Sequence, residues 1–197
     1  MADSKLTALT ALTPIAGEDL LYVVDDPAGS PLNRKMPGTV LRAYAGWPEL
    51  LHIQDLKATT VAGQSCSATT WNIRQLTTVV TNEIAGASLA TNQITLAAGT
   101  YRIFAASMAR RTGDSKLALY NVTDTAYEIV GVSEYSHASS DNSSTWCRLV
   151  GRFTIAATKV FELRQYTTAA EAGGFGTASN DGTSEIYADV EIYREPD

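Results

Sequence analysis

Charged residues are scarce in this sequence, and their balance removes one class of partner. They make up 18% of the 197 residues, and the formal net charge is −6. A nucleic-acid-binding protein needs clustered lysine and arginine to meet the phosphates. The only adjacent basic pairs are Arg34-Lys35 and Arg110-Arg111, each of which fits a solvated turn or strand end. We therefore expect no nucleic acid partner.

Long apolar runs, cysteines and histidines are also few. No run of about 18 apolar residues occurs, so we expect no membrane insertion. The N-terminal stretch MADSKLTALTALTP lacks the charged-then-apolar order of a secretory signal. Cys66 and Cys147 are too few for a disulfide framework, and with only His52 and His137 beside them they predict no zinc site. We expect free thiols, no metal and no cofactor.

What the sequence does have is period-two alternation, which is clearest in Asn92–Arg111. Ile94 and Leu96 alternate with polar residues, Ala98-Gly99-Thr100 interrupts the run, and Tyr101 begins a second one. This pattern predicts two half-buried antiparallel strands on either side of a glycine turn. Similar runs follow at short intervals to the C-terminus, within residues 70–76, 79–84, 116–122, 127–132, 147–155, 161–164 and 186–193. About eight strands in this length predict an all-β head, a jelly-roll β-sandwich.

The final run illustrates the expected register. Its inward row would be Ile186, Ala188, Val190 and Ile192, with the residues between them facing outward. A one-residue slip would turn the whole apolar row to water, so the register should be well fixed.

Residues 1–46 differ in character from the rest. Leu20–Val24 predicts an apolar strand, residues 25–31 are dense in turn formers, and Asn33–Met36 can return as a second strand. Thr39 can cap a short helix that runs through Tyr44 and ends at Gly46. A hairpin and one helix bury too little surface to fold alone, so this segment must dock on something else.

The chain is accordingly divided into three parts: an attachment segment of residues 1–46, a connector of residues 47–68, and a head of residues 69–197. In the connector, Leu50, Leu51, Ile53 and Leu56 recur at roughly helical spacing after Pro48. Two interpretations stay open. Leu51 and Leu56 can pair with copies of themselves around an axis, or the segment can pack beneath the sandwich.

Two stretches carry a resemblance to known families. The order T-A-L-T-A-L-T-P-x-A-G-E-D-L-L-Y-V-V-D-D, followed by a turn, Arg-Lys-Met and a short helix, resembles the N-terminal segments of bacteriophage fibre and tail proteins. The head resembles the C-terminal domains of phage fibres around Trp71, Asn92–Leu96, Leu119–Asp124 and Lys159–Leu163. Gly99-Thr100-Tyr101-Arg102-Ile103 is similar to a strand of the trimeric tumour-necrosis-factor-like and complement-type globular domains.

The resemblance implies a protein of the virion surface, made in the cytoplasm of the host bacterium, in which the first segment attaches to a capsid or tail protein. The residues expected to make that attachment are Leu20, Leu21, Tyr22, Val23, Val24, Val40, Leu41 and Tyr44. It also implies a homotrimer. Rings outside the predicted inward rows would form an unusually apolar patch on a monomer. The residues predicted at the trimer interface are Trp71, Phe104, Tyr187 and Tyr193.

Two polar loops, Ser133–Thr145 and Thr167–Ser184, are longer than a hairpin needs, and long loops on a rigid sandwich are where binding sites tend to lie. Rings there suit sugar stacking, and amide and carboxyl groups suit its hydroxyls. The predicted ligand-binding residues are Tyr135, His137, Asp141, Asn142 and Trp146. The alternative is that Tyr135 and Trp146 only cover strand ends. Gly173–Gly176 predicts a flexible loop.

The catalytic signals are weak. Gly63-Gln64-Ser65-Cys66-Ser67 approaches the nucleophile-elbow pattern but ends in serine where glycine is needed. A pair of Cys147 with His137 would place the thiol on an inward strand position, whereas a reactive thiolate needs exposure. We expect no enzyme. The predicted function is host-surface adhesion through glycan. The alternatives are a capsid decoration protein that binds no receptor and, disfavoured for want of a catalytic set, a surface-polysaccharide esterase.

Overall fold

The computed structural model describes residues 20–25, 32–37, 48–139 and 143–196, which contain thirteen strands and no helix. Accordingly, no described segment is a helix able to cross a membrane. The strands are β1 Leu20–Asp25, β2 Leu32–Pro37, β3 Glu49–Lys57, β4 Thr70–Ile73, β5 Thr78–Asn82, β6 Ser88–Ala90, β7 Gln93–Leu96, β8 Gly99–Arg110, β9 Gly113–Asn121, β10 Ala126–Ser136, β11 Ser144–Ile155, β12 Lys159–Thr167 and β13 Glu185–Arg194.

The chain divides into two compact units, Met1–Trp47 and Pro48–Asp197. In the first unit β1 and β2 pair antiparallel, with Leu20 opposite Pro37 and Asp25 opposite Leu32. The predicted hairpin is therefore present. The predicted helix, and with it Val40, Leu41 and Tyr44, lies outside the described residues.

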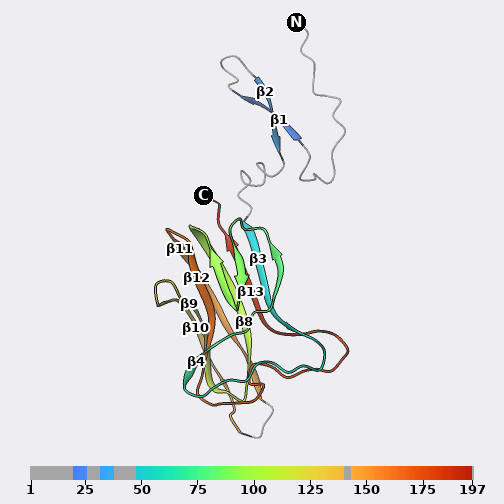
Figure 1. Cartoon of the computed structure of the whole chain (residues 1–197), viewed down its shortest axis with the longest axis vertical. Helices are drawn as coiled ribbons and strands as arrows, with labels where there is room; N and C mark the ends of the chain where they lie inside the picture. Colours follow the sequence, from blue (N-terminus) through green and yellow to red (C-terminus); the bar gives the residue numbers. More distant parts are fainter. Residues whose placement is uncertain (1–19, 26–31, 38–47, 140–142, 197) are drawn as a thin grey trace. The chain divides into compact units, whose positions relative to one another are not determined.

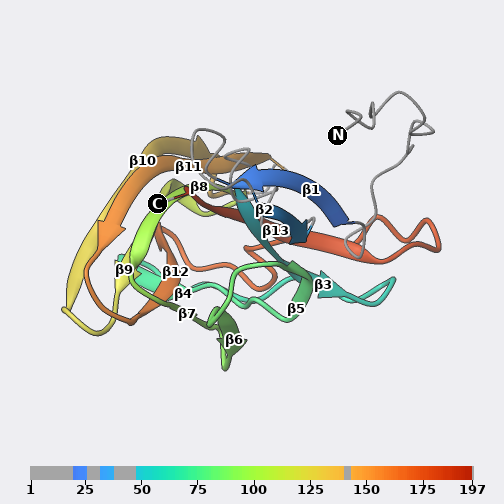
Figure 2. The same ribbon diagram turned by 90° about the horizontal axis from the view of Figure 1, so that it is seen from above.

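The second unit, which we call the head, is a sandwich of two antiparallel sheets (Figures 1 and 2). One sheet has five strands in the order β11-β8-β13-β3-β5. The other has six, in the order β10-β9-β12-β7-β6, with β4 also paired to β12. The predicted all-β jelly-roll sandwich is confirmed.

The core lies between the two sheets, where alternate residues of each strand meet. Phe153 links the layers, since its ring lies 5.5 Å from that of Tyr101 and 5.4 Å from that of Phe161. The predicted inward row of β11 is confirmed, because Cys147, Leu149, Phe153 and Ile155 are all buried. Other core residues include Leu51, Ile53, Ile94, Leu96, Ile103, Leu117, Leu119, Leu163, Val190 and Ile192.

The predicted connector is wrong, because it contains strand β3, which pairs with both β13 and β5. Leu51 and Ile53 are fully buried in the head's own core, so Leu51 does not pair with other copies of itself. The spacing that suggested a helix is a short period-two alternation, with Leu51 opposite Ile192 and Ile53 opposite Val190. The head therefore starts at Pro48.

The two strands within Asn92–Arg111 exist but do not form a hairpin. β7 pairs with β6 and β12, whereas β8 pairs with β11 and β13 in the other sheet. The interruption that predicted a turn is the point where the chain passes from one sheet to the other. Alternation indicates which face of a strand is buried, but it does not indicate which strand it pairs with.

β10 and β11 are edge strands of different sheets and lie against each other at one side of the sandwich (Figure 2). The approach is close enough to require glycine. A Cβ atom on Gly151 would lie 2.5 Å from Cδ1 of Ile129, and one on Gly131 would overlap the carbonyl oxygen of Arg148. This contact closes one side of the sandwich and sets the two strands' exposed residues side by side.

The glycine-rich segment Gly173–Gly176 is packed rather than flexible. The Gly63 amide donates to the Gly176 carbonyl at 3.0 Å, and Phe175 is fully buried. Gly176 has a φ of +156° and lies so close to the ring of Tyr187 that a Cβ would overlap it. The predicted flexible loop is therefore wrong for these residues.

Candidate functional site

The outer face of the five-stranded sheet presents two of the four rings predicted at the trimer interface. Phe104 is 45% exposed and meets Tyr193 edge to face, with ring centroids 6.0 Å apart. Phe104 lies between Val150 of β11 and Glu191 of β13 in the sheet register. Val150 is 63% exposed, so this row begins with two apolar side chains and ends in a carboxylate.

Charges of opposite sign occupy opposite halves of this face. Arg102, Arg148 and Arg152 project from β8 and β11, and the Glu195 carboxylate bridges two of them, at 2.6 Å from Arg102 and 2.7 Å from Arg152. These hydrogen bonds lower the pKa of Glu195 to about 2. Sequence analysis missed the arginines, although the alternation of Arg148, Val150 and Arg152 between buried residues carried the signal.

The acidic half lies on β13, beside β3. Asp189 accepts a hydrogen bond from Gln54 at 3.0 Å and lies 2.7 Å from Nε2 of His52. Glu191 accepts a hydrogen bond from the Tyr193 hydroxyl at 2.9 Å. Within the described parts of the chain, neither carboxylate has a lysine or arginine partner. The face is thus polarised, with excess positive charge on β8 and β11 and excess negative charge on β13.

The other two predicted interface rings do not lie on this face. Tyr187 is 1% exposed, and its hydroxyl donates to the Val61 carbonyl at 2.9 Å. The register of β13 shifts between Ile186 and Ala188, so Tyr187 turns inward and Ile186 is 42% exposed. A bulge of this kind reverses the expected sides of the residues before it. Trp71 is on β4, in the six-stranded sheet, on the opposite side of the head.

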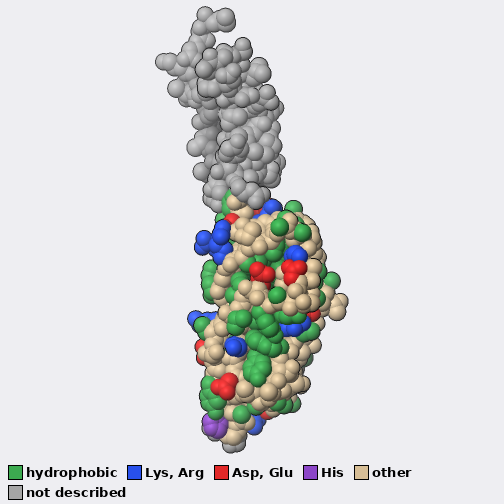
Figure 3. Space-filling view, turned by 90° about the vertical axis from the view of Figure 1, so that its left-hand side faces the viewer, with side chains coloured by type: hydrophobic (Ala, Val, Ile, Leu, Met, Phe, Trp, Pro, Cys, Tyr) green, Lys and Arg blue, Asp and Glu red, His purple; other side chains and the backbone are tan. Residues whose placement is uncertain are grey.

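The side of the head where β10 and β11 meet is markedly apolar, and Figure 3 shows hydrophobic side chains in a band along it. Besides Tyr127, the large hydrophobic residues exposed on these two strands are Val130, Val132, Tyr135, Trp146 and Val150. Val132 is 57% exposed and Val130 51%. We call this set the edge band.

The predicted ligand-binding residues are only partly brought together. Tyr135 and His137 meet edge to face at 6.3 Å, and Ser139 lies 2.9 Å from Nδ1 of the histidine. Trp146 lies on β11, and in the described part of the chain its ring makes no ring–ring contact with Tyr135 or His137. Asp141 and Asn142 lie outside the described residues. Tyr135 also belongs to strand β10 rather than to a loop.

The outer face of the six-stranded sheet carries an aromatic cluster that sequence analysis did not assemble. Trp71 lies 4.9 Å from Tyr127 and 5.5 Å from Tyr166, and Tyr127 lies 5.1 Å from Tyr120. These four rings come from β4, β10, β12 and β9, so they span the sheet. We call them the aromatic platform. In the sequence, Tyr120 follows the inward-facing Leu119 and Tyr166 follows the inward-facing Gln165, so alternation alone could have predicted that both tyrosines face outward.

A polar chain runs along one side of this platform. Gln93 donates to Glu162 at 3.0 Å, and Arg164 binds the same carboxylate through Nε at 2.8 Å. The Arg164 guanidinium also lies 3.5 Å above the ring of Tyr120, a cation–π contact. Arg164 is therefore held in place from two directions.

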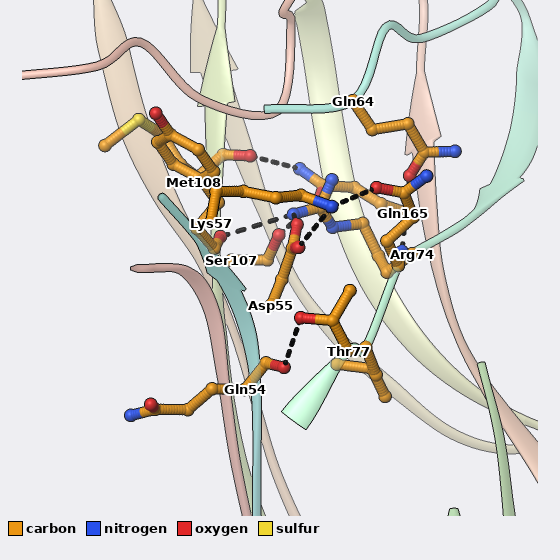
Figure 4. A network of polar contacts seen from close by, with 12 residues as sticks. Gln54, Asp55, Lys57, Gln64, Arg74, Thr77, Ser107, Met108 and Gln165 are labelled. Atoms are coloured by element: carbon orange, nitrogen blue, oxygen red, sulfur yellow. Dashed lines mark hydrogen bonds and ion pairs between the residues drawn. The ribbon is translucent and has the colours of Figure 1, made fainter. Parts of the chain in front are cut away.

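A buried polar cluster lies between the sheets near β3 (Figure 4). Asp55 and Arg74 are both fully buried, 3.5 Å apart, and Lys57 approaches Asp55 at 3.3 Å. Arg74 also donates to the Tyr187 carbonyl at 3.3 Å and lies 4.1 Å above the ring of Phe175. Burial lowers the pKa of Arg74 to about 10, so the group stays charged at neutral pH. Asp55 and Arg74 are closed off from solvent and Lys57 is only partly accessible, so this cluster serves the fold.

Cys147 belongs to a second buried group. Its sulfur donates to Ser115 at 3.2 Å and accepts from Gln165 at 3.4 Å. Burial raises the pKa of the Cys147 thiol. His137, its conceivable catalytic partner, is exposed and contacts Ser139 instead. The structure does not bring the predicted Cys–His pair together.

Both cysteines are free and buried, so we expect them to resist alkylation in the folded protein. Under non-reducing conditions, iodoacetamide should add no group to the native chain and two groups to the denatured chain, as read by intact-mass spectrometry. A denatured chain that takes up no label would show a disulfide and contradict this expectation. Rapid labelling of the native chain would show that a thiol is accessible.

No protein-family model matches the chain, and no curated protein matches its sequence. Solved structures similar to it include murine APRIL, with a TM-score of 0.49 and 10% identity, over 75% of this chain and 98% of that one. Another is the globular domain of zebrafish complement 1qA, with a TM-score of 0.46 and 12% identity, over 75% and 96% of the two chains. At these identities the likeness concerns the fold and leaves ligands and assembly open.

Proposed function

We propose that this chain is a surface protein of a bacteriophage or phage-like particle. Its first unit attaches it to a capsid or tail protein, and its head forms a homotrimer that adheres to glycan on the host envelope. The virion role and its location are supported by the sequence resemblance of the first 45 residues or so to phage fibre and tail proteins. The role requires no catalysis.

The observation that supports the proposed trimer is the outer face of the five-stranded sheet, whose two halves carry charges of opposite sign. Phe104 and Val150 expose large apolar area there, and the edge band continues it around the side. Contiguous apolar surface of this kind marks interaction sites. Arginines occupy one half of the face and carboxylates the other, so a head-to-tail contact brings opposite charges together. Head-to-tail contacts close into rings, and three copies form the ring that we propose.

The attachment role of the first unit is supported by its size. An isolated two-stranded hairpin is marginally stable in water. The β1–β2 hairpin belongs to a separate compact unit from the head. It gains stability most readily by docking on another protein, which in this proposal is the virion component.

The attachment is tested by deleting residues 1–47 and measuring incorporation. Particles assembled in cells that make the shortened chain should lack it, as judged by quantitative mass spectrometry of purified virions. The shortened chain should still show a cooperative thermal transition, which separates failed attachment from failed folding. Incorporation at normal copy number would contradict the proposal, and so would the absence of the full chain from virions.

A further inference from the structure

We propose that the aromatic platform of the six-stranded sheet is a carbohydrate-binding site. Its rings would stack on successive pyranose units of a glycan chain. This inference rests on the proposed adhesive function and assigns the ligand to Trp71, Tyr120, Tyr127 and Tyr166, away from the predicted loop residues.

The rings of the platform pack against one another and over the sheet beneath them. Ala118 lies on the same outward face of β9 as Tyr120, yet it is fully buried and is not part of the core between the sheets. The rings of Trp71 and Tyr127 come from β4 and β10, on either side of β12 and β9, and meet at 4.9 Å, so the two side chains reach across the strand that carries Ala118. Tyr127 remains 43% exposed above it. The result is a continuous aromatic layer with an accessible outer surface.

The polar atoms of these rings are the second observation that supports a carbohydrate-binding site. In the described residues, the Trp71 indole N–H and the hydroxyls of Tyr120, Tyr127 and Tyr166 make no hydrogen bond to the protein. The Trp71 indole N–H and the hydroxyls of Tyr120 and Tyr166 are not among the buried atoms without a partner, so they keep contact with solvent. By contrast, the Tyr101, Tyr187 and Tyr193 hydroxyls each donate to a named acceptor. The platform therefore offers four free polar groups at the rims of apolar rings.

The polar chain beside the platform adds fixed hydrogen-bonding groups. Glu162 is 5% exposed and holds both Gln93 and Arg164, and Arg164 is also stacked on Tyr120. Because these contacts fix the guanidinium, it loses little freedom when a ligand binds. Lys116 lies opposite Tyr166 in the sheet and adds a positive charge on the same face.

Aromatic rings with free polar groups at their edges favour a carbohydrate as the ligand. A pyranose ring has an apolar face of C–H groups, which stacks on aromatic rings, and a rim of hydroxyls, which meets polar groups at the ring edges. A flat apolar protein surface would instead bury the indole N–H and three hydroxyls without partners, which is costly. A nucleic acid needs clustered positive charge, which a chain of net charge −6 does not supply here.

The test uses the full chain and four defined probes: cellohexaose, maltohexaose, chitohexaose and polygalacturonate. The chain has three tryptophans, so a ¹H–¹⁵N spectrum contains few indole N–H signals. The signal that disappears in the Trp71→Phe variant belongs to Trp71. We expect at least one probe at millimolar concentration to shift the Trp71 signal. Trp71→Ala and Tyr127→Ala should each weaken that binding at least tenfold by titration calorimetry.

Two controls separate binding from folding. Trp71→Phe keeps a stacking ring over Ala118 and should retain more affinity than Trp71→Ala at an equal thermal midpoint. Val80→Ala shortens an exposed apolar side chain on β5 of the other sheet, outside the platform and the edge band, and should leave affinity unchanged. If none of the four probes shifts Trp71, the inference is overturned. If binding depends on Trp146 or Tyr135 instead, the inference fails while glycan adhesion as the proposed function stands.

Discussion

Replacing Arg74 with Met is expected to lower the free energy of unfolding by about 3–5 kcal/mol. The substitution leaves Asp55, which is fully buried, with Lys57 as its remaining ion-pair partner. Neither Asp55 oxygen makes a hydrogen bond in the described residues, so nothing else compensates the buried charge. Urea denaturation at one fixed protein concentration measures the loss, because an oligomer's apparent stability depends on concentration.

A double-mutant cycle identifies the cause. Asp55→Asn alone should also destabilise, since it leaves the Arg74 guanidinium buried with one hydrogen bond, to the Tyr187 carbonyl. The double variant should lose less than the sum of the two single changes, because no uncompensated charge remains. Lys159→Met is the control, since its ion pair with Asp124 is exposed and lies away from the proposed contact between copies, and it should leave stability nearly unchanged. Strict additivity of the two losses would contradict the ion-pair account.

Replacing Phe104 with Asp is expected to convert the proposed trimer to a folded monomer. The ring is 45% exposed, so its removal should cost the isolated head little. The new carboxylate would lie beside Glu191 in the sheet register, where it adds negative charge and removes the apolar ring from the proposed contact. Sedimentation velocity of the full chain measures the change. Val61→Asp, at another exposed apolar residue 45% accessible, is the control and should leave the assembly intact.

Charge reversal offers a sharper test of the head-to-tail arrangement. Arg148→Glu and Asp189→Arg should each weaken assembly, because each places like charges across the proposed contact. The two residues occupy one row of the same face, on either side of Ala106. The double variant restores opposite charges between copies and should recover assembly. Loss of assembly in the double variant equal to that in the worse single variant would contradict the polarised contact.

Much of the head could be predicted from alternation alone. The inward row from Cys147 to Ile155 was correct because β11 is regular along its length, with Ser144–Ile155 paired without interruption to β8. The same holds for Ala188, Val190 and Ile192, which are buried as expected. Where a strand is half-buried and unbroken, the period of two determines which side chains enter the core.

The errors in the sequence-based predictions come from structural features that the two-residue period of a strand does not indicate. Tyr187 was placed outward because nothing in the local sequence reveals the register shift at Ile186, although the packed Gly176 leaves room for its ring. β3 was misread because four apolar residues in a short run fit either period. Trp71 was grouped with Phe104 and Tyr193 although it lies on the other sheet, because sheet membership depends on long-range pairing, here with Tyr166.

The candidate surfaces were predicted less well than the core. Phe104 and Tyr193 do share a face, which agrees with their predicted grouping. The aromatic platform was not found, because its four rings come from strands as distant as β4 and β12. Single outward tyrosines are ordinary in a strand, and only the fold shows that these lie within 5.5 Å of one another.

The mass of the full chain in solution tests the central claim most directly. Light scattering coupled to size exclusion, at near-physiological salt, should give three times the 21.1 kDa of one chain. Raising the salt concentration should shift the balance toward single chains, because charges of opposite sign meet at the proposed contact. A mass of one chain at all concentrations would contradict the account, since the polarised face and the edge band would then have no partner copy.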